Sequence, residues 1–279
     1  MPTHVCDDPR FATMVYPSPD VAASIISPSP CRKDVVHGLV RACWWGRPAG
    51  RAKRTVALIG DSHASVWRPA FEQVIRAKGW RAVSLSRAGC PLTLAHPHLP
   101  GLARQRNCMA WNRQAQAFVR HHRRISLVFL AAHRGHVIPP PGETPHAAQL
   151  AGYEAAIRGL LRAGVAHVVV LRDTPRSEAV TLGCIESAVA VHRSPGSACA
   201  VPRIYALRSD PLAQAARALA LPRVSVIDLS RLWCGPASCP PVIGGVLVLR
   251  DRQHMTDAFS QTLGPFLLRA VDRLLRRPA

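Results

Sequence analysis

The chain reads Thr55-Val-Ala-Leu-Ile-Gly-Asp-Ser-His63 at the point where its regular pattern begins. A short apolar run that stops at a glycine is typical of a buried strand that enters a tight turn. Ser62 then lies at the carboxyl end of that strand and at the start of a helix, where backbone N–H groups and the helix dipole favour a negatively charged oxygen. The simpler interpretation is structural, with Ser62 as the helix cap and Asp61 as the turn former.

Strand-like and helical segments alternate along the chain from this point. Apolar runs predict strands at Thr55–Ile59, Ala82–Leu85, Ser126–Leu130, His167–Leu171 and Arg223–Ile227. Amphipathic patterns predict helices at Ala64–Lys78, Met109–Arg123, Ala147–Ala163, Pro211–Ala220 and Asp257–Arg276. Such alternation predicts an α/β fold with a parallel sheet covered on both faces. Long insertions follow the strands and therefore gather at the carboxyl edge of the sheet, where open α/β folds place their sites.

The first 50 residues differ from the rest of the chain. They are poor in regular pattern and rich in proline, at positions 2, 9, 17, 19, 28 and 30. Closely spaced prolines favour turns and extended chain over helices. We therefore predict an arm or lid over residues 1–50 and one α/β domain over residues 51–279, a length that fits a single large domain.

The composition is strongly basic. Lys and Arg number 36 against 16 Asp and Glu, a formal net charge of +20, and since only Lys33, Lys53 and Lys78 are lysines, 36 − 3 leaves 33 arginines. The hydrophobic share of 48% is enough to fill a core and excludes a disordered basic tail. The charge by itself suggests nucleic acid or an anionic surface. The arginines are spread through every segment, however, and no basic helix, aromatic stacking series or nucleic-acid motif accompanies them, so we expect no nucleic-acid partner.

Eight of the nine cysteines fall into four close pairs along the chain. The pairs are Cys31 with Cys43, Cys90 with Cys108, Cys184 with Cys199 and Cys234 with Cys239, and Cys6 is left over. Such spacing suits loop-closing disulfides and thus an oxidising, extracytoplasmic compartment. The alternative is free buried thiols in a reducing compartment. A zinc site is disfavoured because no pair has the two-residue spacing of a zinc knuckle, and we predict neither a metal nor a cofactor.

No segment of the sequence predicts a membrane-spanning helix. The longest apolar runs, Leu127–Ala132 and Val246–Leu249, fall far short of the roughly 18 residues that a spanning helix needs. The first twenty residues carry Asp7, Asp8 and Asp20 and do not predict a signal peptide. A missing export signal conflicts with an oxidising compartment, so the simplest hypothesis is a fragment, or a domain once attached to a membrane portion.

A second motif, Arg250-Asp-Arg-Gln-His-Met-Thr256, precedes the last predicted helix, with Thr256 in the N-cap position. Asp251 stands three residues before His254. In a loop this spacing can place the carboxylate on one ring nitrogen and leave the other free to take a proton from a serine. A lone Asp-x-x-His is common and can arise by accident. Its occurrence together with Ser62 after the first strand is far rarer and favours a Ser–His–Asp site.

Together the two motifs resemble the SGNH (GDSL-like) hydrolase and acyltransferase superfamily. The closest similarity is to the SGNH domain at the carboxyl end of type 3 membrane acyltransferases, which O-acylate cell-surface glycans. Supporting stretches are Val56 to Ala64, Ala88 to Leu92, Cys108 to Asn112, Cys234 to Cys239 and Pro240 to Leu249. The resemblance implies a flavodoxin-like three-layer α/β/α sandwich with a five-stranded parallel sheet. It also implies Ser62 as the nucleophile, His254 as the general base and Asp251 as the residue that orients His254.

The resemblance further implies an oxyanion hole, in which the Ser62 N–H is joined by a glycine N–H and often by an asparagine side chain. Gly89 matches the glycine position. The usual Gly-x-Asn-Asp block after the third strand is missing, because the chain reads Leu130-Ala-Ala-His-Arg134 there. Asn112 is our candidate replacement, and its alternative is a plain packing role. His133 and Arg134, directly after that strand, are candidate substrate contacts, although Arg134 is equally explained as a solvated arginine.

Two further residues lie near the expected site. Asp173 follows the fourth strand and is a rival to Asp251 as the acid of the site. His63 comes directly after the proposed nucleophile, where it either points into the site or begins the helix without a further role.

The function implied is extracytoplasmic transfer of an acyl group, most simply acetyl, onto or off a carbohydrate hydroxyl. Ser62 would carry the acyl group, and a separate membrane acyltransferase module is a candidate partner. The alternative is a catalytically degenerate domain that binds anionic glycan or another polyanion through its arginines.

Overall fold

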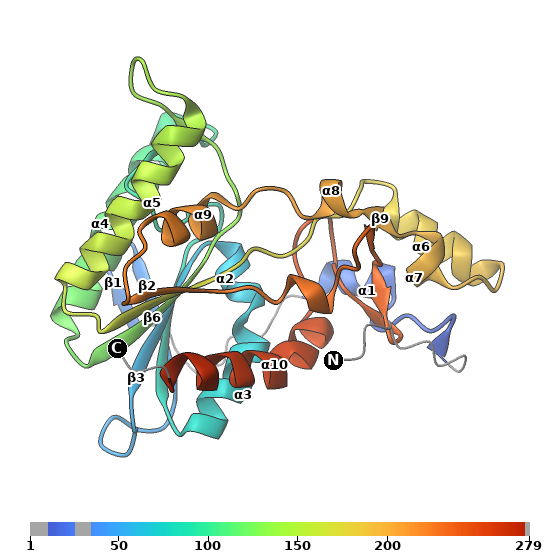
Figure 1. The fold of residues 1–279 in the computed structure, drawn as a ribbon, viewed down its shortest axis with the longest axis horizontal. Coiled ribbons are helices and arrows are strands. Elements are labelled where there is room, and N and C mark those ends of the chain that lie inside the picture. The colour runs from blue at the N-terminus through green and yellow to red at the C-terminus, as the bar shows by residue number, and fades with distance from the viewer. Residues whose placement is uncertain (1–10, 26–34, 277–279) are drawn as a thin grey trace.

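The fold is built around a seven-stranded sheet (Figure 1). The computed structural model describes residues 11–25 and 35–276. In spatial order the strands are β1 (Val35–His37), β2 (Val40–Gly46), β4 (Arg81–Ser86), β3 (Thr55–Gly60), β6 (Ile125–Ala131), β8 (His167–Leu171) and β10 (Val224–Ile227). The five strands from β4 to β10 run parallel to their neighbours, whereas β2 and β1 extend the sheet in antiparallel fashion beyond β4.

Helices cover both faces of this sheet, which confirms the three-layer sandwich. Figure 1 shows α4, α5 and α9 on one side of the sheet and α3 and α10 on the other. Their bounds are α3 (Arg68–Lys78), α4 (Leu102–His121), α5 (Pro145–Arg162), α9 (Pro211–Ala218) and α10 (Asp257–Leu275).

Strand β3 shows why both faces need a helix layer. Ala57 and Ile59 pack into the core beneath α4 and α5, whereas Val56 and Leu58 pack into the core beneath α3 and α10. Alternate residues of a strand point to opposite faces. A strand that is apolar throughout is therefore buried on both sides, as central strands of parallel sheets are.

The predicted strands all appear as the five parallel strands, and their bounds differ from the prediction by no more than one residue at either end. Strands β1 and β2 were not predicted. Residues 35–46, which were predicted to belong to an N-terminal arm, form these strands, and β2 pairs with β4 from Ala42 to Gly46. Val40, Ala42 and Cys43 are buried there. The proline density of residues 1–50 therefore misled the prediction for this part, because residues 35–46 contain no proline.

The helix predicted at Ala64–Lys78 is divided in two. A short helix, α2 (Ser62–Val66), is followed directly by α3, and the break falls at Trp67. Pro69 lies in the first turn of α3. Proline has no N–H to donate to the preceding turn and its ring clashes with a continuing helix, so a new helix begins there.

A smaller lobe lies beside the carboxyl edge of the sheet (Figure 1). It combines α1 (Pro19–Ser24), α6 (Thr181–Ala190), α7 (Pro195–Ala198), β12 (Val242–Ile243) and β13 (Val246–Leu247) around a small apolar core. Tyr16 ties the N-terminal segment to this lobe, since its N–H donates to Gly245 O and its carbonyl accepts from Leu247 N. The remaining short elements are β5 (His96–Pro97), β7 (Val137–Ile138), β9 (Val201–Pro202), α8 (Arg203–Ala206), η2 (Ser230–Leu232) and β11 (Ser238–Cys239).

Disulfides close three of the loops as predicted. They join Cys90 to Cys108, Cys184 to Cys199 and Cys234 to Cys239. Cys43 is also disulfide-bonded; Cys31, its predicted partner, lies outside the described residues, as does Cys6. Within residues 11–25 and 35–276, no helix combines the length and apolar character that crossing a membrane requires.

Candidate active site

Ser62, His254 and Asp251 form a hydrogen-bonded chain at the carboxyl edge of the sheet. His254 Nε2 lies 2.9 Å from Ser62 Oγ, and His254 Nδ1 lies 2.7 Å from Asp251 Oδ2. The serine follows β3, whereas the other two residues lie in the loop before α10. A nucleophile in hydrogen-bond contact with a base, which is itself held by a carboxylate, is the arrangement that serine catalysis requires.

The loop itself holds Asp251 in its ionised form. Its Oδ1 accepts the backbone N–H groups of Gln253 and His254, both at 2.8 Å. Burial raises the pKa of Asp251, but the hydrogen bonds from the His254 ring and from these two N–H groups outweigh burial and set the pKa at about 2. An ionised carboxylate only accepts hydrogen bonds, so His254 Nδ1 carries a proton and Nε2 is left as the acceptor for the Ser62 hydroxyl.

Hydrogen bonds on both sides fix this loop to α10. Thr256 Oγ1 accepts the N–H of Phe259 at 3.1 Å, which confirms Thr256 as the N-cap of the helix. The backbone of Arg250 donates to His254 O at 2.9 Å. His254 therefore sits in a closed loop anchored at the N-terminus of α10 rather than in a free segment.

Asp61 has a larger part than that of a turn former. It is the N-cap of α2, so Ser62 is the first residue of the helix and not its cap. Its carboxylate is buried and accepts the N–H of His63 at 2.8 Å and the N–H of His133 at 2.9 Å. Burial raises the pKa of Asp61. One carboxylate thus ties the turn after β3 to the turn after β6, directly beside Ser62.

Two glycines, at the end of β3 and in the loop after β4, have backbones that favour glycine. A Cβ on Gly60 would lie 1.8 Å from the carbonyl oxygen of Ala131, so only glycine allows the end of β3 to approach β6 this closely. Gly89, in the loop after β4, has a left-handed backbone with φ of 67°. Its N–H donates to no group among the described residues. The N–H of Ser62, in the first turn of α2, likewise has no helical acceptor.

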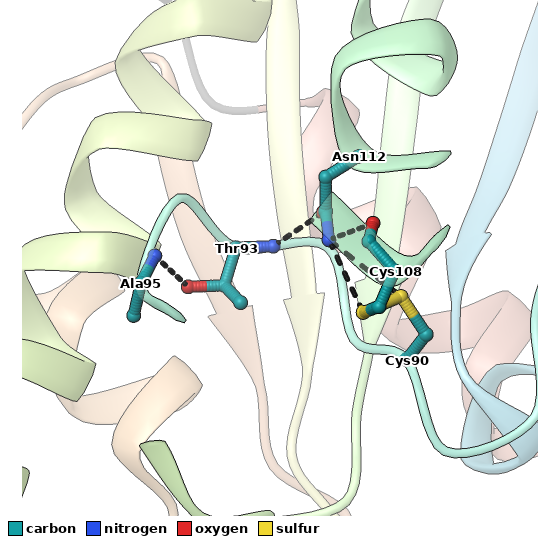
Figure 2. Close-up of a disulfide and its surroundings, with 5 residues drawn as sticks. All are labelled: Cys90, Thr93, Ala95, Cys108 and Asn112. Atoms are coloured by element: carbon teal, nitrogen blue, oxygen red, sulfur yellow. Dashed lines mark hydrogen bonds between the residues drawn. A yellow bond between two sulfur atoms is a disulfide. The ribbon is translucent and has the colours of Figure 1, made fainter. Parts of the chain in front are cut away.

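Asn112 does not make the contacts expected of an oxyanion donor. Figure 2 shows it turned toward the Cys90–Cys108 disulfide. Its Nδ2 donates to Cys108 O at 3.1 Å and lies 3.6 Å from both sulfur atoms, while its Oδ1 accepts the N–H of Thr93 at 2.8 Å. The structure corrects this assignment: both ends of the buried amide fasten the loop that carries Gly89 to α4.

His133 and Arg134 directly follow β6, and His133 lies beside His63, the neighbour of Ser62 in sequence. The His133 ring is half-buried, and its centroid lies 4.8 Å from that of His63. Burial, with the nearby positive charge of His63, lowers the pKa of His133 to about 4, so the ring is neutral. Arg134 is exposed. Both residues line a small cavity together with Arg172, Asp173, Thr174, Arg176, Ala206, Leu207, Arg208, Ser209 and Asp210.

A second His–Asp pair, which the sequence did not reveal, lies beside the triad. His63 is 1% exposed, and its Nδ1 lies 2.5 Å from Asp173 Oδ1. Asp173 therefore pairs with His63, and Asp251 is the carboxylate on His254. Both residues are candidates in the sequence, but they lie 110 positions apart and no local spacing links them. Among the described residues, no group of three or more His, Cys, Asp or Glu side chains is arranged to hold a metal ion.

The parallel sheet is covered by helices on both faces, and its first parallel strand, β3, ends at a serine that contacts a His–Asp pair. This combination defines the SGNH class of α/β domains. Residues 30–269 match the family described as SGNH domain (fused to AT3 domains), and the chain belongs to that family.

The chain is also similar to a solved structure, the periplasmic domain of the lipopolysaccharide acetyltransferase of Salmonella ser. Paratyphi A. The TM-score is 0.60 at 15% sequence identity, over 80% of this chain and 85% of that chain. At this identity the likeness is one of fold. No curated protein sequence matches the chain significantly.

Proposed function

We propose that this protein is a serine-dependent O-acyltransferase or acylesterase that acts on cell-surface carbohydrate. The observation that carries the proposal is the unbroken hydrogen-bond chain from Ser62 through His254 to Asp251. Membership of a family of SGNH domains fused to AT3 domains supports acyl chemistry, and the acetyltransferase domain of similar fold supports acetyl as the group and carbohydrate as the acceptor.

In the proposed reaction, Ser62 Oγ attacks the carbonyl carbon of the acyl donor while His254 Nε2 takes the hydroxyl proton. The negative charge that develops on the carbonyl oxygen is stabilised by the N–H groups of Ser62 and Gly89. The tetrahedral intermediate collapses to an ester on Ser62, and the leaving group departs with the proton from His254. Asp251 stabilises the positive imidazolium that exists between the two proton transfers.

The second half of the reaction reverses these roles. A sugar hydroxyl or a water molecule gives its proton to His254 Nε2 and attacks the ester on Ser62. The intermediate then collapses, His254 returns the proton to Ser62 Oγ, and the acylated sugar or the free acid leaves. His133 and Arg134, at the edge of the site, are the proposed contacts of the acceptor.

An extracytoplasmic location completes the proposal. The three disulfides of the described residues are stable in an oxidising compartment. The similar solved structure is a periplasmic domain. The proposed partner is a membrane acyltransferase module that supplies the acyl donor, as the family description of fusion to AT3 domains suggests.

A fluorophosphonate probe tests this proposal, because it reacts with a serine only when a base activates the hydroxyl. We expect the wild-type protein and Ser65→Ala to be labelled and Ser62→Ala and His254→Ala to remain unlabelled. Ser65 is the matched control, since it lies on the same short helix. A wild-type protein that resists labelling and hydrolyses no p-nitrophenyl acetate, yet binds acidic polysaccharide, would establish the degenerate binding domain instead.

A further inference from the structure

The His63–Asp173 pair lies against the base of the proposed triad. The ring centroid of His63 is 5.1 Å from that of His254, with the ring planes inclined by 52°. Asp173 is 14% exposed and holds the opposite side of His63 through Nδ1. His63 Nε2 is buried and has no hydrogen-bond partner among the described residues. The pair is therefore internal to the site and is not a surface ion pair.

The segment that carries Asp173 also supports the catalytic loop. Thr174 Oγ1 donates to Gln253 O at 3.0 Å, beside His254. Ser177 donates twice, from its N–H to Arg252 O at 2.9 Å and from its hydroxyl to Asp251 O at 3.2 Å. The position of Asp173 is itself set by Asp210, whose Oδ2 accepts the Asp173 N–H at 2.9 Å. The segment that pairs with His63 is thus hydrogen-bonded to the loop that carries His254, so a change at one can move the other.

Three carboxylates face His63. Asp61 precedes it, Asp173 pairs with it, and Asp251, which is bonded to His254 Nδ1, acts on its charge from farther away. The rings of His133 and His254 lie beside it, and Thr174 Oγ1 lies 3.4 Å from its Nδ1. Burial lowers the pKa of His63, but the charge and hydrogen bond of Asp173, together with Asp61 and Asp251, outweigh burial and raise it to about 9. His63 is therefore positively charged at neutral pH.

Building on the proposed function, we infer that His63 and Asp173 form a positioning pair for His254. The His63 imidazolium packs against the His254 ring and neutralises Asp173, so that Asp251 alone acts as the carboxylate on His254. An unpaired charge on Asp173 would favour protonated His254 and so withdraw the base from Ser62. His63, which directly follows Ser62 and which the triad mechanism does not use, thus has a role in positioning the base.

The test compares the pH dependence of kcat/KM for p-nitrophenyl acetate in variants of different charge. In His63→Asn, Asp173 is left unpaired, so we expect kcat/KM to fall by about tenfold or more. The acidic limb of the profile should also move upward by about one pH unit. In the double variant His63→Asn with Asp173→Asn, neither charge is present. The acidic limb should then return to its wild-type pH, while kcat/KM stays low. A merely structural role would lower the rate of both variants without moving the limb, and that outcome overturns the inference.

His167→Asn is the matched control, since His167 is half-buried and hydrogen-bonded to Ser225 but begins β8 at the opposite edge of the sheet. Its profile should equal that of the wild type. Should His63→Asn fail to fold, ¹⁵N NMR of the wild-type protein at pH 7.5 decides instead, because both ring nitrogens of His63 must be protonated; a neutral ring overturns the inference. Hydrolysis that persists in Ser62→Ala refutes the proposed function, whereas loss of hydrolysis there with an unmoved limb in His63→Asn refutes only the positioning pair.

Discussion

His254 Nε2 and Ser62 Oγ lie 2.9 Å apart although 192 residues separate them in sequence. The contact joins the carboxyl end of the first parallel strand to the loop that enters the last helix. Because α10 packs along α3, which follows Ser62 in sequence, the two halves of the site are fixed to one helix layer. The geometry of the triad therefore depends on the packing of α3 against α10. The effects of substitutions in the site can be predicted from the contacts of each side chain.

Asp251→Asn should lower kcat by about 10²- to 10⁴-fold while leaving the fold intact. The amide can donate to His254 Nδ1, which would place the ring proton on Nε2 and remove the acceptor that Ser62 needs. The measurement is steady-state hydrolysis of p-nitrophenyl acetate. Asp272→Asn is the control, because Asp272 pairs with Lys78 on the surface of α10; equal activity in both variants would contradict the assigned role.

Gly89→Ala should lower kcat/KM by about 10- to 100-fold and cost about 1 kcal/mol of unfolding free energy. The left-handed backbone at φ of 67° is strained for alanine, and relaxation displaces the N–H from the proposed oxyanion position. Gly142→Ala separates the two effects. Gly142 also has a left-handed backbone, with φ of 83° and no atom within 4 Å of an added Cβ. It should lose the same stability and keep its activity, as chemical denaturation and kinetic assays can show.

Replacing both Cys90 and Cys108 by serine should destabilise the protein by about 3 kcal/mol. The bridge closes a loop across 18 positions, and Asn112 packs on it. Since the same loop carries Gly89, kcat should fall as well. The serine pair at Cys184 and Cys199, with a separation of 15, should lose comparable stability without a loss of kcat, because it lies in the smaller lobe. Unchanged kcat in the Cys90 and Cys108 variant would show that the loop keeps its position without the bridge.

The free energy of unfolding should fall as pH rises from 6.5 toward 9. His63 has an ordinary pKa of 6.5 and a folded pKa of about 9, so it binds a proton more tightly in the folded state. Its stabilising contribution is then complete below pH 6.5 and is lost as the pH passes through 9. Urea unfolding at several pH values measures how the free energy of unfolding changes with pH. Between pH 6.5 and 9 this change should vanish in the double variant His63→Asn with Asp173→Asn. His167 behaves in the opposite way. Burial lowers its pKa, so its effect on the free energy of unfolding appears below pH 6.5.

Local pattern was sufficient for most of the fold and for locating the three residues of the proposed triad. The parallel strands are continuous apolar runs, and a run buried on both faces can be recognised without knowing its neighbours. Ser62, Asp251 and His254 stood out because turn chemistry and capping residues mark the carboxyl end of a strand and the start of a helix. The cysteine pairs could be predicted for the same reason, since each of the three observed bridges closes a short stretch of chain.

Contacts between distant segments could not be predicted in this way. Strand β2 is defined by pairing with β4 rather than by a pattern of its own. Asn112 lies in a helix, and only the packing of α4 against the loop after β4 turned its amide to the disulfide and away from the predicted role.

The sequence by itself determined the parallel α/β sheet and marked Ser62, Asp251 and His254 as candidate site residues, because strand burial, turns and caps are local properties of the chain and the two motifs resemble one family. Tertiary structure alone decided the partners of the remaining polar groups near Ser62. Asp173 pairs with His63, and Asp61 accepts the N–H groups of His63 after β3 and His133 after β6. The physical reason is that a buried charge must find an opposite charge or a donor in the folded interior. Which one it finds depends on the strands and loops that the sheet brings side by side.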